Sequence, residues 1–432
     1  MGFTFIDLFA GIGGFHAALE PLGGSCVFAS EIDPAARRIY EKNWRMKTSG
    51  DIIPLTDPKV MVAEHDVLCA GFPCQPFSKS GKQRGMEESR GTLFWNIARI
   101  IEECKPSLVL LENVRNIAGP RHRHEWEVII STLRTLGYAV SSEPTVFSPH
   151  WLPPEMSGTP QVRERVFIVG VRVGADNAQG LTHLPPLVRK GPVEGWNPLN
   201  WDLAKDLPLQ DDDQIEELHR YLLSADEERW IDVWNDFLDS VDCEKLPGFP
   251  IWADDLRADP DIPAGTPKWK HDFLVKNATF YVSHRQQIDE WKVRHNNLES
   301  IPASRRKLEW QAQDSERDLR KCVLHFRPSG IRAKRGTYLP ALVAITQTSI
   351  IGSKSRRITP REAARLQGLP NWFSFDGQSD ALSYKQLGNG VAVGAVRHIF
   401  LSALREYADF LPNNLRVATD FDYSTRNMET VA

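Results

Sequence analysis

The chain has 432 residues, which is enough for two domains of ordinary size. It carries 52 Lys and Arg against 56 Asp and Glu, a formal net charge of −4, which excludes a uniformly basic nucleic-acid binder. Apolar residues make up 41% and charged residues 25%, a balance typical of globular and not of disordered chains.

Membrane and secretion signals are not evident in the sequence. No stretch reaches the roughly 18 uninterrupted apolar residues of a spanning helix, and the first residues lack a basic region and a cleavage site. The six cysteines are scattered without paired spacing, as reduced thiols of the cytosol are. The sequence therefore predicts a cytoplasmic protein that does not bind a membrane.

The first 175 residues alternate short apolar runs with longer helical patterns. Because each apolar run is bounded by Gly, Pro or a charged residue, we interpret these runs as buried parallel strands. The predicted strands are Phe3–Phe9, Ser25–Ser30, Asp66–Ala70, Ser107–Leu111 and Val166–Val171, and the predicted helices are Pro34–Asn43, Thr92–Cys104 and His124–Leu136. This alternation predicts an α/β protein with a doubly wound, Rossmann-like sheet, which binds ligands at the carboxyl ends of its strands.

Beyond residue 175 this alternation is lost and two charged blocks follow. Residues 202–261 hold 19 Asp and Glu against 5 Lys and Arg, whereas residues 265–335 hold 16 Lys and Arg against 8 Asp and Glu. Within the acidic block, helically spaced apolar residues indicate a packed core; they are Leu218, Tyr221, Leu222, Trp230, Trp234 and Leu238. Helical patterns return at Pro360–Gln367 and Val391–Tyr407, and the polar tail after Phe410 is expected to be loosely held.

A glycine turn follows the first predicted strand, in the segment Asp7–Gly14 (DLFAGIGG). Glycines there allow the backbone to approach a ligand closely. Glu31, directly after the second strand, stands where a carboxylate can bind ribose hydroxyls. His16 occupies the position of the third glycine of dinucleotide folds, so a nucleoside without pyrophosphate, such as S-adenosylmethionine, fits better. A tight turn without a ligand is the alternative.

Cys74 lies on a Gly- and Pro-rich loop directly after the third strand, within Gly71–Ser78 (GFPCQPFS). Such a loop presents a cysteine as an exposed nucleophile, although most cysteines are simply small buried side chains. The following polar segment carries Lys79, Lys82 and Arg84, as expected of a flap over a phosphate backbone.

Glu112 ends a strand that should be fully buried, so its carboxylate needs a partner or a raised pKa. Arg163 and Arg165 share one face of an extended segment, so both guanidinium groups can point into the same cleft. A buried ion pair that serves only the fold is the alternative for these residues.

Six segments in this order resemble the DNA (cytosine-5) methyltransferase family, of the prokaryotic modification type. Leu369 replaces a phenylalanine usual in the family, and the resemblance covers roughly residues 1–175 and 356–405. The matching segments are Asp7–Gly14, Gly71–Ser78, Glu112–Val114, Gln161–Arg165, Arg357–Pro370 and Gln386–Val391.

The resemblance implies a role for each matching residue. Cys74 is expected to add to C6 of a cytosine flipped out of double-stranded DNA, Glu112 to bind N3 and the exocyclic amine, and Arg163 with Arg165 to orient Glu112 and hold the base. The implied cofactor is S-adenosylmethionine, with no metal. Its expected contacts are Phe9, Gly11, Gly13, Glu31, Asp51, Ile52, Leu93, Asn389 and Val391.

The resemblance also implies the division of the chain. Residues 1–175, completed by 383–410, are expected to form the catalytic and cofactor-binding domain, residues 176–382 a target-recognition domain and residues 411–432 a tail. The acidic block would repel DNA and is expected to lie away from the duplex. The expected DNA contacts are Gln75, Ser78, Lys79, Lys82 and Arg84 near the nucleophile, and Arg327, Arg332, Lys334 and Arg335 in the recognition domain.

The resulting hypothesis is a monomeric modification methyltransferase, with a cognate restriction endonuclease as a possible partner. A tRNA cytosine methyltransferase is an alternative that the long recognition region and the Pro73-Cys74-Gln75 sequence disfavour. A DNA-binding regulator without activity is a second alternative, disfavoured by the intact Cys74 and Glu112.

Overall fold

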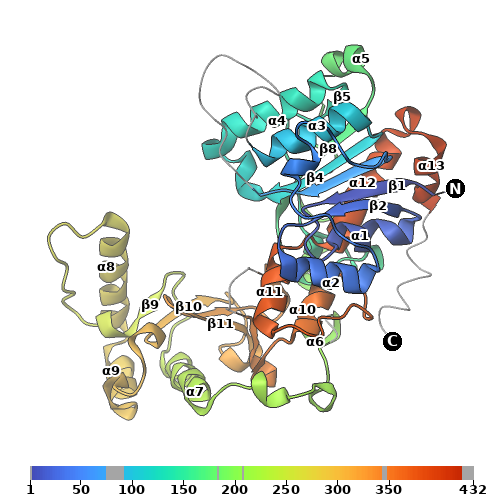
Figure 1. The fold of residues 1–432 in the computed structure, drawn as a ribbon. Helices are drawn as coiled ribbons and strands as arrows, with labels where there is room; N and C mark the ends of the chain where they lie inside the picture. Colours follow the sequence, from blue (N-terminus) through green and yellow to red (C-terminus); the bar gives the residue numbers. More distant parts are fainter. Residues whose placement is uncertain (1, 74–91, 182–183, 207–208, 343–347, 421–432) are drawn as a thin grey trace.

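The computed structural model describes residues 2–73, 92–181, 184–206, 209–342 and 348–420. Two sheets organise these residues, a larger one near the N-terminus and a smaller one from the middle of the chain (Figure 1). The two sheets lie in separate lobes that are joined by the segments around α10 (Pro360–Leu366) and α11 (Asp380–Asn389).

The larger sheet has the strand order β2-β1-β3-β4-β8-β5, with β6 also paired to β8. Its first four strands are parallel, whereas β8 runs antiparallel to β4. The prediction that Val166–Val171 is a parallel strand is therefore wrong, because an apolar run buried on both faces looks the same in either direction. The bounds are β1 (Thr4–Leu8), β2 (Ser25–Ser30), β3 (Val67–Gly71), β4 (Leu108–Val114), β5 (Tyr138–Val140), β6 (Thr145–Phe147) and β8 (Arg165–Arg172).

Successive residues of the parallel strands enter two different cores, one on each face of the sheet. Phe5 packs with α1, α2 and α12, whereas Ile6 packs with α3 and α4. Helices on both faces confirm the predicted doubly wound α/β class. The bounds of these helices are α1 (Gly14–Leu19), α2 (Pro34–Trp44), α3 (Leu93–Cys104), α4 (Arg123–Thr135) and α12 (Val393–Glu406).

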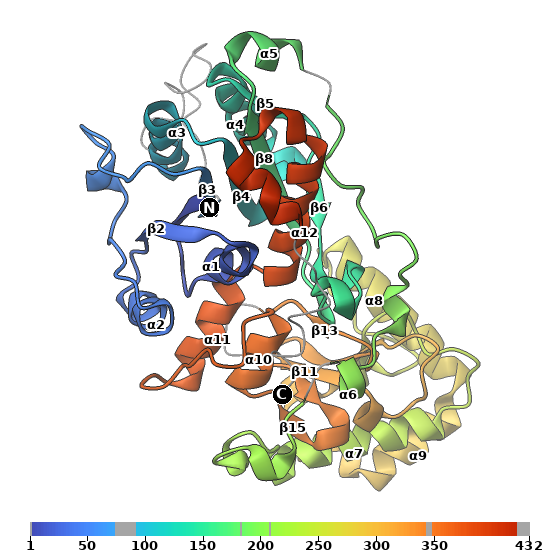
Figure 2. The same cartoon turned by 90° about the vertical axis from the view of Figure 1, so that its right-hand side faces the viewer.

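The C-terminal part returns to the larger sheet. Ile358 and Phe373 are fully buried in the same core as α1 and α12, so the packing does not follow the predicted domain boundary at residue 382. Figure 2 shows α10 and α11 between the smaller sheet and helices α1 and α2. Leu411 and Leu415 are also buried there, Leu415 on α13 (Asn413–Arg416), so the described start of the predicted loose tail is packed through its apolar residues.

The segment Asp380–Glu406, which contains α11 and α12, is the one stretch of the described residues long and apolar enough to cross a membrane. In its most apolar window, 72% of the residues are buried inside the protein. We therefore interpret it as core structure.

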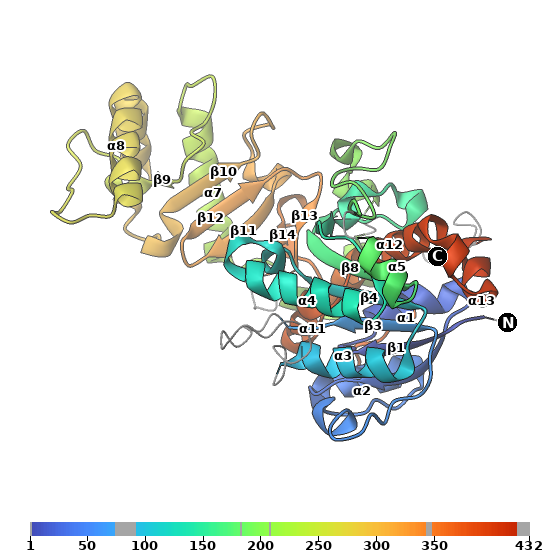
Figure 3. The same cartoon turned by 90° about the horizontal axis from the view of Figure 1, so that it is seen from above.

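The smaller sheet has the order β15-β14-β11-β12-β10-β9 and, in Figure 3, extends away from the larger one. Its strands are β9 (Ile251–Trp252), β10 (Lys307–Gln311), β11 (Val323–Arg327), β12 (Gly330–Lys334), β14 (Ile350–Ile351) and β15 (Arg356–Arg357), with helices α7 (Ala225–Ser240), α8 (Lys268–Ser283) and α9 (Arg285–Arg294). Short elements complete the described chain: α5 (Ala175–Gly180), α6 (Leu203–Asp206), β7 (Gln161–Val162) and β13 (Leu339–Pro340).

The acidic block provides α7, whose apolar side packs on the smaller sheet. Trp234 and Leu238 are buried as predicted, but Leu222 precedes the helix and is exposed, so its assignment to the core is wrong. The other side of α7 forms ion pairs with the basic block: Arg320 binds both Glu228 and Asp232, and Asp236 pairs with Arg294. The two charged blocks of the sequence therefore fold into one unit.

Candidate active site

A cavity of about 450 Å³ opens at the carboxyl ends of β1, β2, β3 and β4. This size is typical of small-molecule sites. The cavity brings together residues far apart in sequence, because α11 closes the side opposite β4. Seven of the nine predicted cofactor contacts line it, namely Phe9, Gly11, Glu31, Asp51, Ile52, Leu93 and Asn389.

The turn after β1 leaves room for a ligand at Gly11. Its backbone has φ +55°, and a Cβ built on it meets no atom within 4 Å, so the open space belongs to the cavity. The Gly11 N–H donates to Glu31 Oε2 at 2.8 Å, and the Asp33 N–H donates to Glu31 Oε1 at 2.8 Å. These bonds fix the Glu31 carboxylate at the cavity wall, where it can accept hydrogen bonds from a ribose.

Gly13 and Val391 support the wall from behind and do not line the cavity. Gly13 has φ +93°, and a Cβ there would lie 2.0 Å from Nε1 of Trp44. Val391 packs against Gly14, where a Cβ would approach its side chain to 2.6 Å. Both predicted contacts thus hold the turn in place by close packing.

Glu112 lies at the end of β4 with its carboxylate buried, as the sequence predicted. Burial raises the pKa of Glu112, and the neighbouring Arg165 and Arg163 oppose this shift. Arg165 Nε lies 3.1 Å from Glu112 Oε1, so this arginine is the direct partner of the carboxyl group. The pair faces the cavity from β4 and β8.

Arg163 lines the same cavity but has partners that differ from the predicted one. Its terminal nitrogens donate to the carbonyl oxygens of Leu342, Gly388 and Gly390, at 2.9, 2.9 and 2.6 Å. Burial lowers the pKa of Arg163 to about 9, which still leaves it cationic at neutral pH. It therefore ties the segment around Asn389 to the edge of the sheet that holds Glu112, because its terminal nitrogens bind carbonyl oxygens and not Glu112.

The loop predicted to carry the nucleophile continues beyond Pro73, the last residue that the structure describes before residue 92. Cys74, Gln75, Ser78, Lys79, Lys82 and Arg84 lie outside the described residues. Asn113, beside Glu112, donates its side-chain N–H to the carbonyl of Phe72 at 2.8 Å. This contact was not predicted, although Asn113 belongs to the matching segment Glu112–Val114. It fixes the chain two residues before Cys74, next to Glu112.

The predicted DNA contacts of the middle region fall into two groups. Arg327, Arg332 and Lys334 line one cavity of about 230 Å³ on the smaller sheet. Arg335 does not line it and pairs instead with Asp314 and Gln313. The structure thus brings three of the four cations together.

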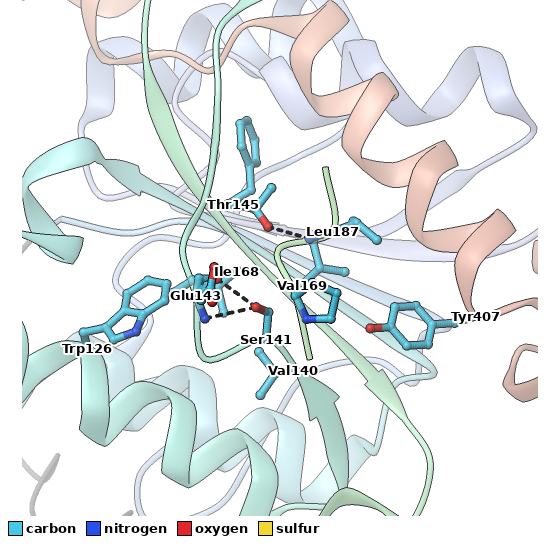
Figure 4. Close-up of a pocket in the computed structure, with 11 residues that line it drawn as sticks. Trp126, Val140, Ser141, Glu143, Thr145, Ile168, Val169, Leu187 and Tyr407 are labelled. Atoms are coloured by element: carbon cyan, nitrogen blue, oxygen red, sulfur yellow. Dashed lines mark hydrogen bonds between the residues drawn. The ribbon is translucent and has the colours of Figure 1, made fainter. Parts of the chain in front are cut away.

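Figure 4 shows a further pocket, near β5, β6 and β8. It offers only about 10 Å³; Ser141 Oγ lies 2.9 Å from the carbonyl oxygens of both Glu143 and Leu184, either of which can accept its proton, and Thr145 Oγ1 accepts from the Leu187 N–H. It cannot hold a cofactor. Among the described residues, no group of three or more His, Cys, Asp or Glu has the arrangement of a metal site.

Comparison with known proteins gives this cavity its context. The model of the C-5 cytosine-specific DNA methylase family matches residues 3–405. The chain is 46% identical to the type II methyltransferase M.AluI of Cellulosimicrobium cellulans, over 93% of this chain and 92% of that protein. It is 31% identical to the type II methyltransferase M.HhaI of Haemophilus parahaemolyticus, over 92% and 93%.

Among solved structures, a putative DNA modification methyltransferase encoded within a prophage of E. coli is similar in fold. The TM-score is 0.50 at 20% identity, and the match covers 94% of this chain and all of that one. The matched family model spans both the cavity and the smaller sheet. The chain therefore belongs to the C-5 cytosine-specific DNA methylase family and is a DNA cytosine methyltransferase.

Proposed function

We propose that this enzyme methylates C5 of a cytosine flipped out of a specific sequence in double-stranded DNA, through a covalent bond between Cys74 and C6. The observation that carries the proposal is the cavity that joins Glu112 and Arg165 to Gly11, Glu31 and Asn389. One end of this cavity suits a nucleoside, and the other offers the carboxyl group that a cytosine edge requires.

S-adenosylmethionine, the methyl donor of the family, supplies the methyl group when bound. The residues at the cavity fit it: Glu31 offers carboxylate oxygens, Gly11 leaves open space, and Asp51, Ile52, Leu93 and Phe9 complete the wall. Gly13 and Val391 act indirectly by holding the turn. Asn389 reaches the same wall because Arg163 binds the carbonyl groups on both sides of it.

Glu112 recognises and activates the base. With its raised pKa, the carboxyl group retains a proton more readily than an exposed glutamate, donates it toward N3 and accepts from the exocyclic amine. Arg165 fixes the orientation of the carboxyl group at 3.1 Å. Proton donation at N3 stabilises the negative charge that enters the ring when a nucleophile adds to C6.

The Cys74 thiolate forms the bond to C6, and the electron pair moves into the ring so that C5 accepts the methyl group. The C5 proton then leaves, the ring double bond forms again, and the sulfur departs. A base inside a duplex offers no face to this attack, so the target has to leave the stack. Gln75, Ser78, Lys79, Lys82 and Arg84 surround Cys74 in sequence and are proposed to contact the DNA.

The covalent step is tested with duplex DNA that carries 5-fluorocytosine at the target. Fluorine cannot leave C5 as a proton does, so the methylated adduct persists and migrates as a stable complex in denaturing gels. Cys74→Ala should give no complex. A stable complex with Cys74→Ala, or none with the unchanged enzyme on a DNA that it methylates, would contradict the covalent mechanism.

We also place the enzyme in the cytoplasm, as a monomer beside a restriction endonuclease for the same sequence. The relatives M.AluI and M.HhaI are type II methyltransferases by name. Sedimentation with and without duplex DNA tests the monomer, and resistance of host DNA to a matching endonuclease activity tests the partnership.

A further inference from the structure

The smaller sheet has one apolar and one polar face. Leu308, Leu324 and Ile331 are fully buried and pack with α7 and α9, which lie below the sheet in Figure 1. Their neighbours along the strands point the other way, because side chains alternate across a sheet. The polar face carries Glu309, Gln311, His325, Arg327, Arg332 and Lys334.

The strand register brings three of these polar groups into one row, which Ser349 extends. Glu309 on β10 is paired with Arg332 on β12, and Arg332 is paired with His325 on β11. His325 Nε2 lies 2.9 Å from Ser349 Oγ, which extends the row toward β14. Since β10, β11 and β12 are hydrogen-bonded neighbours, this row is rigid.

The polar face borders the active site. The cavity of about 230 Å³ over it is lined by His325, Arg332 and Lys334 from the sheet, and by Leu342 and Tyr384 from the adjoining lobe. Arg163 of the catalytic cavity donates to the Leu342 carbonyl. The polar face therefore adjoins the cavity proposed to receive the target base, where base pairs that flank the target can reach it.

The charges on the polar face do not balance. Glu309 accepts from Arg332 Nε at 2.7 Å and lies 3.5 Å from Arg327, so one carboxylate serves two guanidinium groups. Lys334 has no ion-pair partner among the residues that the structure describes. Its pKa is lowered by burial and by both arginines. His325 is neutral because burial and these cations lower its pKa to about 4.

An excess of partly buried cations requires acceptor groups from a ligand, because unpaired charge in a half-buried site is costly. The cations that α7 neutralises, such as Arg320, lie in the other part of the lobe. The ion pairs of α7 therefore do not neutralise the cations of the polar face.

Arg332 is held more closely by Glu309 than Arg327 is. Glu309 Oε2 lies 2.7 Å from both Nε and Nη2 of Arg332, which fixes the plane of the guanidinium group. Glu309 therefore occupies the Nε–Nη2 side of the guanidinium group. The remaining N–H groups, on Nη1 and Nη2, are available to a ligand. Two parallel donors in a fixed plane match the O6 and N7 acceptors on the major-groove edge of guanine.

We infer that Arg332 reads one guanine of the target sequence through O6 and N7, and that Glu309 is the positioning residue that makes this contact selective. Lys334, a compact charge without a fixed plane, serves the phosphate backbone. The inference rests on the proposed function, since it concerns the specificity of the same methyl transfer.

The experiment first maps methylated cytosines in host DNA to obtain the recognised sequence, and then replaces each of its guanines singly by 7-deazaguanine, which lacks the N7 acceptor. For the unchanged enzyme, one replacement should lower kcat/KM about 10- to 100-fold, the range of a lost bidentate contact. Arg332→Ala should lower kcat/KM by a similar factor on normal DNA. In this variant, 7-deazaguanine at the same position should lower kcat/KM no further.

Two further variants complete the test. Glu309→Gln should reduce the preference for guanine over 7-deazaguanine at the same position, with an unchanged dependence of DNA binding on salt. Arg285→Ala, a matched control on α9 outside the cavity, where Arg285 pairs with Asp289, should retain the full preference. If Arg332→Ala keeps the full 7-deazaguanine penalty at every position and instead weakens binding uniformly with a smaller salt dependence, Arg332 is a phosphate contact and the inference is wrong.

The inference and the proposed function fail in different ways. An unchanged enzyme that methylates no cytosine in any sequence overturns the proposed function. The guanine contact alone is overturned if the enzyme methylates a defined sequence but Arg332→Ala removes the 7-deazaguanine penalty at no position of it.

Discussion

The two polar surfaces of the enzyme are built on different principles. At the edge of the larger sheet, Glu112 and Arg165 form a single buried pair, and the surrounding cavity is shaped by backbone turns. On the smaller sheet, Arg327 and Arg332 share the carboxylate of Glu309, and Lys334 lines the same cavity without an ion-pair partner among the described residues. We propose that the first arrangement holds one small, defined chemical group, whereas the second attracts an extended polyanion and selects among its edges.

Removing the carboxyl group from the catalytic pair should have the largest effect. Glu112→Gln keeps the shape but loses the acidic proton, so kcat should fall by about 10²–10³-fold, as when one transition-state donor is removed. Methyl transfer to a defined duplex is the measurement. Glu309→Gln, the same change on the smaller sheet, should leave kcat within about tenfold at saturating DNA; equal losses in both variants would erase the distinction between the two surfaces.

Filling the cavity at the glycine turn should act on the cofactor alone. Gly11→Leu adds a side chain in the open space at φ +55°, so affinity for S-adenosylmethionine should fall at least about tenfold. Gly23→Leu is the control, since Gly23 has φ +87° and open surroundings but does not line the cavity. Calorimetric titration of both variants separates a blocked site from backbone strain, and equal losses would argue against a cofactor at Gly11.

Reversing charges on the smaller sheet should weaken DNA binding and spare the cofactor site. Arg332→Glu with Lys334→Glu is expected to reduce DNA affinity about tenfold or more at moderate salt, because each cation near a phosphate adds to counterion release. Lys205→Glu with Lys245→Glu makes the same charge change within the acidic block and should have little effect. Equal DNA affinities across a salt series would show that the polar face does not bind DNA.

Low pH should destabilise both lobes because buried histidines become protonated. Of the effects predicted here, we expect this one to be the smallest. Burial lowers the pKa of His16, His150, His325 and His398 to about 4, below the ordinary value of about 6.5. The unfolded chain therefore binds these protons first, and stability is lost as the pH falls from about 6.5 to 4.

His398→Phe offers a way to measure one share of that loss. The His398 ring stacks on Phe147 with centroids 4.7 Å apart, so a phenyl ring can keep the contact without the charge. The decrease of Tm between pH 6.5 and 4.5 should be smaller in the variant. An equal decrease of Tm in the variant and the unchanged protein would show that His398 does not contribute to the acid sensitivity.

Much of the larger sheet and its site was accessible from sequence. Apolar runs and glycine turns located the strands, and Glu112, Gly11 and Glu31 follow them directly, so chain position alone places these residues at one edge. The direction of β8 was not accessible, because a strand buried on both faces carries no mark of orientation. The partners of Arg163 were also hidden, since they are backbone carbonyl groups of segments more than 150 residues away.

For the smaller sheet, the sequence predicted only an acidic and a basic block and not the strands themselves. Its strands are short, β9 and β10 lie more than 50 residues apart, and the pairing of Glu309 with Arg332 depends on register. The ion pairs of α7 with Arg320 and Arg294 explain why an acidic block belongs in a DNA enzyme. Net charge averages over these pairs and hides the polar face.

The central claim is that Cys74 and Glu112 together methylate C5 of cytosine in duplex DNA. Bisulfite sequencing of DNA from a host that expresses either the unchanged chain or Cys74→Ala tests it most directly. We predict protected cytosines in one sequence context with the unchanged chain and none above background with the variant. Absence of any protected context with the unchanged chain, or the same pattern with Cys74→Ala, would contradict the account.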